Sequence, residues 1–145
     1  MAGPDDLPDL ARLRWLDAEP EERADQSVED FTTALAQWWA ANEGSHRAFV
    51  AVQDNELVGM AWLAVVERVP RPGASSRRSG DIQSVFVLAE NRGHGIGTEL
   101  VRTASDQALK LGADRVTVHS SRSAVPVYER LGFHSSRELL HRPAP

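Results

Sequence analysis

The chain has 145 residues, of which 41% are hydrophobic and 26% are charged, and its formal net charge is −5. These values are typical of one globular domain and exclude a disordered chain. Because the sequence contains no cysteine, it cannot form disulfides, thiolate metal sites or a covalent cysteine acyl-enzyme.

The sequence carries no signal for a membrane or for secretion. No apolar run approaches the roughly 20 residues that span a bilayer. The aspartates at positions 5, 6 and 9 do not fit a secretory signal. We therefore expect a single cytoplasmic domain, residues 1–145, without a membrane partner.

Charge is unevenly distributed along the chain. Residues 1–45 contain 11 acidic residues against 3 arginines, a net −8, whereas the remaining residues contain 10 acidic against 13 basic residues, a net +3. A nucleic-acid-binding protein would present a basic face, so this distribution argues against nucleic acid as a partner, and the basic remainder suits an anionic ligand. The acidic stretch 19–30 would favour a cationic acceptor if it faced a cleft, and the alternative is a solvated acidic surface.

The expected elements begin with two helices. Apolar spacing predicts one helix over residues 8–16 and a second with Phe31, Trp38 and Trp39 on its apolar side, ended by Gly44. The acidic stretch between them is expected to be a loop or a helix entrance. We expect one of the two adjacent tryptophans in the core and the other partly covered by loops. A place in the wall of an acceptor pocket, or in a homodimer contact, is the alternative for one of them.

Strands are expected in the middle of the chain. Residues 48–52 and 57–66 predict an antiparallel hairpin. The loop 70–80, rich in proline, glycine, serine and arginine, is expected to be mobile. Strand 82–88 lacks clean alternation, as expected of a strand that is covered on both faces.

The last third of the chain is expected to alternate helices and strands. Its predicted elements are helix 98–111 with an apolar stripe and with Gly112 ending it, strand 115–120, helix 124–131 with Ser123 as its N-cap, and a last strand over 133–140.

The strongest local signal is the heptapeptide Arg92-Gly93-His94-Gly95-Ile96-Gly97-Thr98, between a buried strand and a helix. Three glycines at alternate positions let the backbone turn sharply and approach a ligand closely. The helix that follows supplies free N–H groups and the positive end of its dipole, which suit a phosphate or pyrophosphate. The loop is not a Walker A loop, since no Lys-Ser/Thr follows the last glycine, and its spacing departs from the dinucleotide fingerprint. A glycine-rich turn without a ligand is the alternative.

The order of elements and motifs from Asp81 to Phe133 resembles the GNAT superfamily of N-acetyltransferases. Val85-Phe86-Val87 resembles the central strand of that family, and Arg92 to Gly97 resembles its coenzyme A pyrophosphate loop. The segment Ala124-Val125-Pro126-Val127-Tyr128-Glu129-Arg130-Leu131-Gly132-Phe133 resembles its last motif. The chain departs from the family pattern at Ala89, where proline is common, and at Ser121, where an asparagine often contacts the coenzyme.

The resemblance implies a fold and an activity. The fold would be α/β (α+β), with a mixed, mostly antiparallel central sheet flanked by helices. The activity would be transfer of an acetyl group from acetyl-coenzyme A to a primary amine, without a metal. Since the first strand of the family would precede Pro4, we expect that strand to be absent from this chain, and a sequence that begins late is the alternative.

The resemblance also implies roles for the coenzyme-binding residues. The backbones of Val85 and Val87 are expected to pair with the pantetheine arm as an added strand would. A backbone N–H near Phe86 or Val87 would polarise the thioester carbonyl. The residues from Arg92 to Thr98 are expected to hold the pyrophosphate, and Ser121 stands at the position of the asparagine that contacts the coenzyme.

Two side chains are candidates for proton transfer. Tyr128, the only tyrosine in the chain, stands in the general-acid position of the family, where a phenol with a pKa near 10 can protonate the departing thiolate. Its alternative role is that of a core aromatic. Where the family often has a glutamate as base, this chain has Gln83, which cannot accept a proton in that way. Asp81, two residues earlier on the same strand face, is therefore the candidate base, directly or through water, with a solvated carboxylate as the alternative.

Two other classes of function remain open at this stage. A non-catalytic coenzyme A-binding or sensing domain would keep the loop without a base, and Gln83 favours it, whereas Tyr128 favours the enzyme. A phosphate-binding module unrelated to acyl transfer is disfavoured by the missing Lys-Ser/Thr. The histidines at positions 46, 94, 119, 134 and 141 show no paired ligand spacing, so no metal site is expected.

Overall fold

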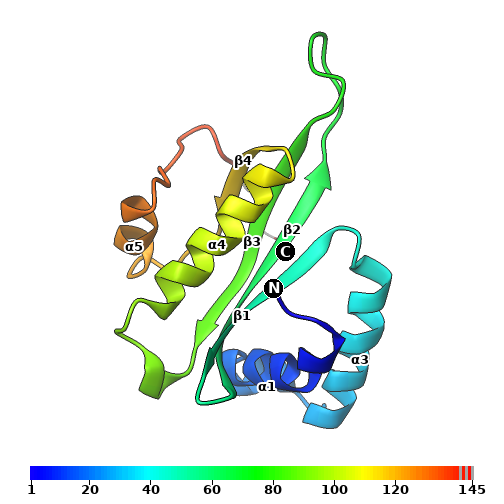
Figure 1. Cartoon of the computed structure of the whole chain (residues 1–145), viewed down its shortest axis with the longest axis vertical. Helices are drawn as coiled ribbons and strands as arrows, with labels where there is room; N and C mark the ends of the chain where they lie inside the picture. Colours follow the sequence, from blue (N-terminus) through cyan, green and yellow to red (C-terminus); the bar gives the residue numbers. More distant parts are fainter. Residues whose placement is uncertain (141, 143, 145) are drawn as a thin grey trace.

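A computed structural model describes residues 1–140, 142 and 144 of the chain. At its centre is a sheet with the strand order β1 (His46–Gln53), β2 (Glu56–Glu67), β3 (Arg78–Val87) and β4 (Ala113–Val118). The strands β1, β2 and β3 are antiparallel to one another, and β4 is parallel to β3. The prediction of an α/β fold with a mixed, mostly antiparallel sheet is confirmed (Figure 1).

One face of the sheet carries α1 (Leu7–Asp17) and α3 (Val28–Asn42). Leu10 and Leu13 of α1 are fully buried in one cluster with Met60 of β2. These two leucines lie three residues apart, so they share one side of the helix, and their burial there explains why α1 packs flat on the sheet.

The other face carries α4 (Ile96–Lys110). Its apolar stripe, spaced as the sequence predicts, is buried on the sheet and consists of Leu100, Val101, Ala104 and Ala108. Gly112, with φ 85°, follows the helix in the left-handed conformation that favours glycine and ends it as predicted.

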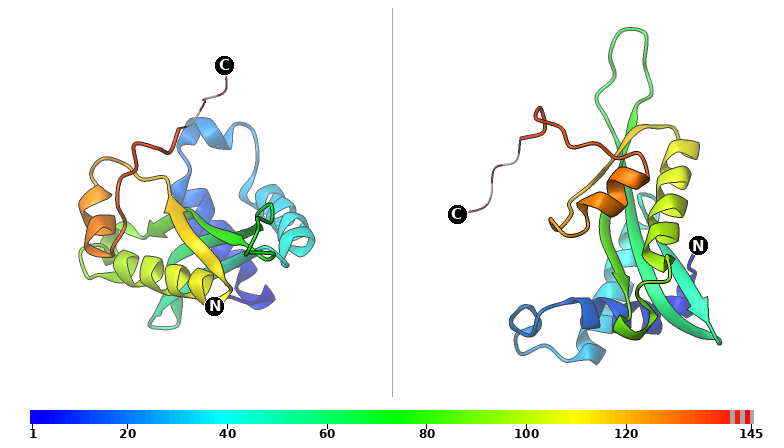
Figure 2. Two further views of the ribbon diagram at one scale, coloured as in Figure 1. Left: turned by 90° about the horizontal axis from the view of Figure 1, so that it is seen from above. Right: turned by 90° about the vertical axis from the view of Figure 1, so that its left-hand side faces the viewer.

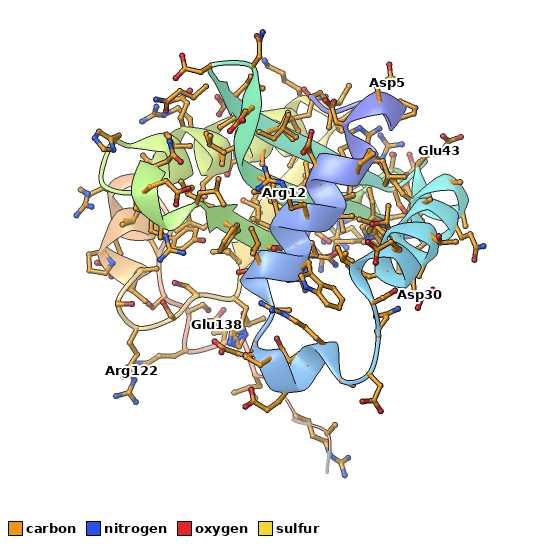
Figure 3. All side chains as sticks on the ribbon, turned by 90° about the horizontal axis from the view of Figure 1, so that it is seen from below. Asp5, Arg12, Asp30, Glu43, Arg122 and Glu138 are labelled. Atoms are coloured by element: carbon orange, nitrogen blue, oxygen red, sulfur yellow. The ribbon has the colours of Figure 1, made fainter. Side chains whose placement is uncertain are left out.

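Short helical segments complete the architecture: the 3₁₀ turns η1 (Pro4–Asp6) and η2 (Ala89–Asn91), and the α-helices α2 (Pro20–Arg23) and α5 (Val125–Arg130). The acidic stretch that was expected to be a loop or a helix entrance thus contains α2 and the start of α3. Figure 3 shows this stretch from below, with Asp30 at the first turn of α3. In the part of the chain that the structure describes, no helix has both the length and the apolar character needed to cross a bilayer.

The segment between β2 and β3, where a mobile loop over 70–80 is expected, belongs to a hairpin that projects from the end of the sheet (Figure 2). Gly80, which the sequence places in a mobile loop, lies in β3 and is buried there. The reason is close packing, since a Cβ atom at this position would lie 2.8 Å from Cβ of Ala108 in α4. The base of the hairpin is held by Asp114, which pairs with Arg68 and Arg77 at 3.5 Å each.

The prediction of a last strand over residues 133–140 is wrong. This segment passes beside β4 without joining the sheet, and its backbone turns at Glu138, whose N–H donates to Oγ of Ser136 (3.1 Å). Leu139 and Leu140 are 64% and 87% exposed. The segment therefore has no apolar face that pairing with β4 would bury.

The sequence predicts Ser123 as the N-cap of α5, and this prediction is wrong. The cap position is held by Ala124 without a side-chain hydrogen bond, and Oγ of Ser123 instead lies 3.1 Å from Oγ of Ser121. At the other end of the chain, the residues before Pro4 form no strand, although the N–H of Ala2 donates to the carbonyl of Ala48 in β1 (2.9 Å).

Candidate active site

The pairing of β3 changes at Gln83. Trp62 of β2 lies opposite Ser84, and Leu63 lies opposite Ile82, so Gln83 has no opposite residue and forms a β-bulge. The pairing of β3 with β4 also ends at Ile82. Beyond the bulge, β3 therefore presents an edge that β4 does not cover, which an extended ligand can use as an added strand would.

A cavity of about 780 Å³, called here the large cavity, lies beside this edge. It is formed by the end of β3, the glycine loop, the start of α4, the end of α1 and α5. The predicted site residues that line it are Val85, Phe86, Val87, Arg92, Gly93, Gly95, Ile96, Gly97, Thr98 and Tyr128. One cavity thus contains most of the residues predicted to bind the coenzyme together with the predicted general acid.

Two predicted coenzyme residues do not line the large cavity. His94 is exposed, and its Nδ1 lies 3.3 Å from the carbonyl oxygen of Asn91. Ser121 lines a smaller, neighbouring cavity. The contact of either residue with a coenzyme stays a prediction.

The glycine loop has the conformation that its sequence favours. Gly93 and Gly95 have φ angles of 80° and 81°, in the left-handed region that side chains rarely adopt. Gly95 is also the N-cap of α4, and no side chain caps this helix end. The first N–H groups of α4 are therefore available for an anion at the positive end of the helix.

Two arginines add positive charge to the large cavity. Nε of Arg92 donates to the carbonyl of Val87 (2.8 Å), and its guanidinium lies 5.6 Å from the centre of the Phe86 ring. These contacts fix the glycine loop to the end of β3. Arg130 lines the same cavity and was not among the predicted site residues. Its signal in the sequence was its place in α5, two residues after Tyr128.

Tyr128 is half-buried, and its ring packs edge-on against Phe133 with the centroids 5.5 Å apart. Burial raises the pKa of the Tyr128 phenol above its ordinary value of 10.0. The phenol is thus protonated throughout the physiological range. A protonated hydroxyl at the wall of the large cavity is able to donate a proton there.

Comparison with known proteins gives the family. Residues 7–133 match the acetyltransferase (GNAT) family. The chain belongs to this family. A glucosamine 6-phosphate N-acetyltransferase from Trypanosoma brucei brucei is 30% identical over 89 residues, which represent 61% of this chain and 58% of that protein. The chain therefore matches less than two thirds of the length of this relative.

Solved structures agree in fold over nearly the whole chain. A Trypanosoma brucei acetyltransferase superposes on this chain with a TM-score of 0.77 and 23% identity, and the match covers 99% of this chain and 96% of that protein's chain. A Clostridium acetobutylicum protein described as a predicted acetyltransferase, in a structure with acetyl-CoA, covers 98% and 92%, with a TM-score of 0.73 and 21% identity. The chain thus has the GNAT fold.

A second cavity of about 220 Å³, called here the bulge cavity, adjoins the large one and contains a carboxylate that the sequence analysis missed. Asp17, the last residue of α1, lines both cavities, as does Tyr128. Oδ2 of Asp17 accepts hydrogen bonds from Nη1 of Arg14 (2.8 Å) and Oγ of Ser84 (3.1 Å). In the sequence, the only available signal was an acidic residue directly after the first predicted helix.

Asp81, the candidate base from the sequence, lines neither of these two cavities. Its Oδ1 accepts a hydrogen bond from Oγ1 of Thr117 in β4 (2.9 Å). The bulge at Gln83 interrupts the alternation on which the prediction relied, so residues before and after it no longer share faces by simple counting. A catalytic role for Asp81 stays a prediction.

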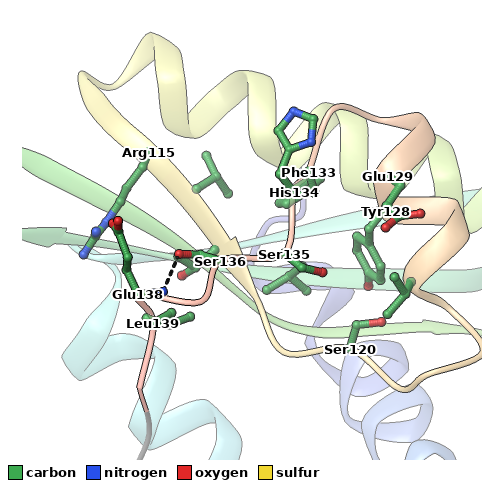
Figure 4. A pocket seen from close by; sticks show the side chains of 14 residues that line it. Arg115, Ser120, Tyr128, Glu129, Phe133, His134, Ser135, Ser136, Glu138 and Leu139 are labelled. Atoms are coloured by element: carbon green, nitrogen blue, oxygen red, sulfur yellow. Dashed lines mark hydrogen bonds between the residues drawn. The ribbon is translucent and has the colours of Figure 1, made fainter.

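A further cavity of about 500 Å³ lies between β4 and the segment 133–139, on another side of Tyr128. Figure 4 shows the Tyr128 side chain projecting from α5 towards the loop that carries Ser120, with Phe133 and His134 on the neighbouring segment. Tyr128 therefore lies where three cavities meet.

No group of three histidine, cysteine, aspartate or glutamate side chains that could hold a metal ion occurs among residues 1–140, 142 and 144. Of the histidines considered as ligands from the sequence, His141 lies outside the described residues.

Proposed function

We propose that the protein transfers the acetyl group of acetyl-coenzyme A to a primary amine by direct attack within a ternary complex. One observation carries the proposal: the free edge of β3, the uncapped end of α4 and Tyr128 line the same cavity. A coenzyme that binds to the edge and to the helix end brings its thioester close to a proton donor.

The anionic part of the coenzyme would lie on the amides from Gly93 to Thr98. Their helix end, together with the charges of Arg92 and Arg130, supports this assignment. The pantetheine arm would pair with the backbone of Val85 and Val87, and a nearby N–H would polarise the thioester carbonyl. The acetyl-CoA in the structure of the related Clostridium protein agrees with the choice of coenzyme.

Tyr128 would act as the general acid. In the reaction, the amine nitrogen forms a bond to the acetyl carbon while the bond between carbon and sulfur breaks. The Tyr128 hydroxyl gives its proton to the departing thiolate and regains a proton from the nitrogen, which has become more acidic. Since its pKa is raised above 10.0 by burial, the phenol carries the proton that this role requires at neutral pH.

A non-catalytic coenzyme A-binding domain is the second candidate, since the bulge in β3 carries Gln83 instead of a carboxylate. A thiol-release assay with acetyl-coenzyme A decides between the two. The amine panel should include polyamines, amino acids, peptide N-termini and glucosamine 6-phosphate. The last amine is included because a similar protein is a glucosamine 6-phosphate N-acetyltransferase. Amine-dependent thiol release with a matching acetylated product supports the enzyme. Coenzyme binding by calorimetry without thiol release from any amine supports the binding domain.

A further inference from the structure

We infer that the acceptor amine binds with its ammonium group at Asp17 and its apolar body against Phe31, Trp38 and Trp62. The substrate class is therefore a primary amine on an aromatic or bulky apolar body. This inference rests on the proposed acetyl transfer and specifies where its second substrate binds.

Shared lining residues connect three cavities into one route. The bulge cavity shares Asp17 and Tyr128 with the large cavity. It shares Arg14, Gln83 and Ser84 with a third cavity of about 350 Å³, called here the tryptophan cavity. An acceptor in the tryptophan cavity can thus reach Tyr128 and the thioester along the bulge of β3.

Asp17 is suited to receive an ammonium group. It is the only carboxylate among the described residues that line the bulge cavity, and its side chain is 28% exposed. Both hydrogen bonds that orient it, from Arg14 and from Ser84, end on Oδ2. Oδ1 thus keeps its lone pairs for a donor from the cavity.

One side of the tryptophan cavity is apolar and largely aromatic, and the polar residues Arg14, Gln83 and Ser84 line the rest. Phe31, Leu35 and Trp38 of α3 line it, together with Trp62 of β2, and no acidic residue does so within the described part of the chain. Trp38 is 39% exposed, and its ring is held edge-on by the buried ring of Trp62, with centroids 5.8 Å apart. An exposed indole that lines a cavity indicates an apolar ligand, because such a ligand would bury the apolar face of the ring away from water.

Asp17 also acts as the proton acceptor of the reaction, a role that the amide of Gln83 cannot fill. Oδ1 takes one proton from the ammonium group, directly or through a water, which leaves the nitrogen lone pair free to attack the acetyl carbon. This proton then passes from Asp17 to solvent. The second nitrogen proton returns to Tyr128 after the phenol has protonated the thiolate, so that acetylated amine, thiol and one released proton balance the reaction.

The substrate class is tested with 2-phenylethylamine and tryptamine against ethanolamine and glucosamine 6-phosphate. We expect kcat/KM to be at least about 10-fold higher for the two aromatic amines. Trp38→Ala should raise KM for 2-phenylethylamine by on the order of 10-fold and leave the Kd of acetyl-coenzyme A unchanged. Trp39→Ala is the matched control, because this neighbour also packs on Trp62 but does not line the tryptophan cavity. Equal kcat/KM for all four amines, or an equal effect of the two tryptophan substitutions, overturns the assignment.

The role of Asp17 is tested by Asp17→Asn, which keeps the shape and removes the charge. We expect kcat/KM for 2-phenylethylamine to fall at least 100-fold, on the scale of general-base catalysis. An unchanged kcat/KM, or a loss that follows Asp81→Asn instead, overturns the assignment. Binding of 2-phenylethylamine, followed by tryptophan fluorescence, gives a readout besides activity. Specific binding without thiol release would contradict the proposed function alone, whereas thiol release without a preference for apolar amines would contradict this inference alone.

Discussion

Oγ of Ser84, the residue that follows the bulge in β3, donates a hydrogen bond of 3.1 Å to Oδ2 of Asp17 at the end of α1. The two residues are 67 positions apart in the chain. Nη1 of Arg14 donates to the same oxygen at 2.8 Å. The two donors together fix the orientation of the carboxylate, which lies between the large cavity and the bulge cavity.

Ser84→Ala should weaken binding of the acceptor amine without changing the affinity for the coenzyme. Without the hydroxyl, Asp17 keeps only the bond from Arg14, so its carboxylate is less well oriented. We expect KM for the amine to rise several-fold, with kcat less affected, and the Kd of acetyl-coenzyme A to stay the same. Steady-state kinetics with calorimetry measure the difference. Ser76→Ala, in the exposed hairpin loop, is the control.

Gly95→Ala should weaken coenzyme binding through the backbone. A Cβ atom would meet no atom within 4 Å, so its cost comes from the φ angle of 81°. Gly73→Ala in the hairpin loop is a matched control, since that glycine has a φ angle of 80° and also has nothing within 4 Å. Each substitution should lower stability by about 1 kcal/mol, the usual cost of a side chain in this conformation. Only Gly95→Ala should raise the Kd of acetyl-coenzyme A, and equal Kd values for the two variants would exclude the loop as the pyrophosphate site.

Tyr128→Phe should lower turnover with little effect on coenzyme binding, because only the hydroxyl is lost. The expected decrease in kcat is on the order of 10²–10⁴-fold. Single-turnover measurements separate the chemical step from product release. If kcat stayed at the level of the parent protein, Tyr128 would have a packing role against Phe133.

The same tyrosine allows a direct measurement of its pKa, since it is the only one in the chain. Tyrosinate absorbance should show a midpoint above 10 in the folded protein, because burial raises the pKa. In the unfolded chain the phenol titrates near 10. Its contribution to stability is therefore complete below pH 10 and is lost as pH rises through the folded pKa. Urea unfolding at pH 8 and pH 11 should show a smaller loss of stability for Tyr128→Phe than for the parent protein.

Gly80→Ala should destabilise the fold without touching the site. Its Cβ atom would lie 2.8 Å from Cβ of Ala108, so β3 and α4 would have to move apart. Overpacking of this kind costs roughly 1–3 kcal/mol. The cost should be partly relieved in the double variant Gly80→Ala/Ala108→Gly, which removes the facing methyl group. Urea unfolding gives the coupling between the two positions, and additive effects would mean that the clash is absorbed elsewhere.

The sequence predicted those features that depend on local backbone chemistry. The glycine loop, the apolar stripe of α4 and the end of that helix at Gly112 follow from residues close together in the chain, and the structure has all three. The place of Tyr128 in the large cavity followed from the resemblance of its motif to the GNAT family.

Features set by packing between distant segments were missed. Gly80 was assigned to a loop because nothing in the sequence indicates its contact with α4. The bulge at Gln83 depends on the register with β2, and it undermined the reasoning that chose Asp81 as the base. Asp17 approaches β3 only once α1 packs on the sheet. The segment 133–140 has strand-forming residues but no partner for its exposed leucines.

The acidic stretch before α3 offers a separate test of how the acceptor reaches the site. Glu19 lines the large cavity, whereas Glu21, Glu22 and Asp25 are exposed beyond it and do not line it. Because these three charges lie outside the cavity, they affect the rate at which a cation reaches the site more than the affinity of the bound cation. They should therefore increase the encounter rate for cationic amines at low salt.

Replacement of Glu21, Glu22 and Asp25 together by glutamine should raise KM for cationic amines and leave KM for acetyl-coenzyme A unchanged. The backbone should tolerate the change, since the Glu22 side chain accepts a hydrogen bond from the N–H of Glu19 (2.9 Å) and a glutamine oxygen can do the same. The difference between variant and parent should disappear at 1 M salt, where the screening length falls from about 10 Å at 0.1 M to about 3 Å. Kinetics at the two salt concentrations measure it, with Glu90→Gln on the exposed turn η2 as the control. If the triple variant matched the parent protein at both concentrations, the acidic stretch would be ordinary surface, and acceptor selection would depend on Asp17 and the tryptophan cavity alone.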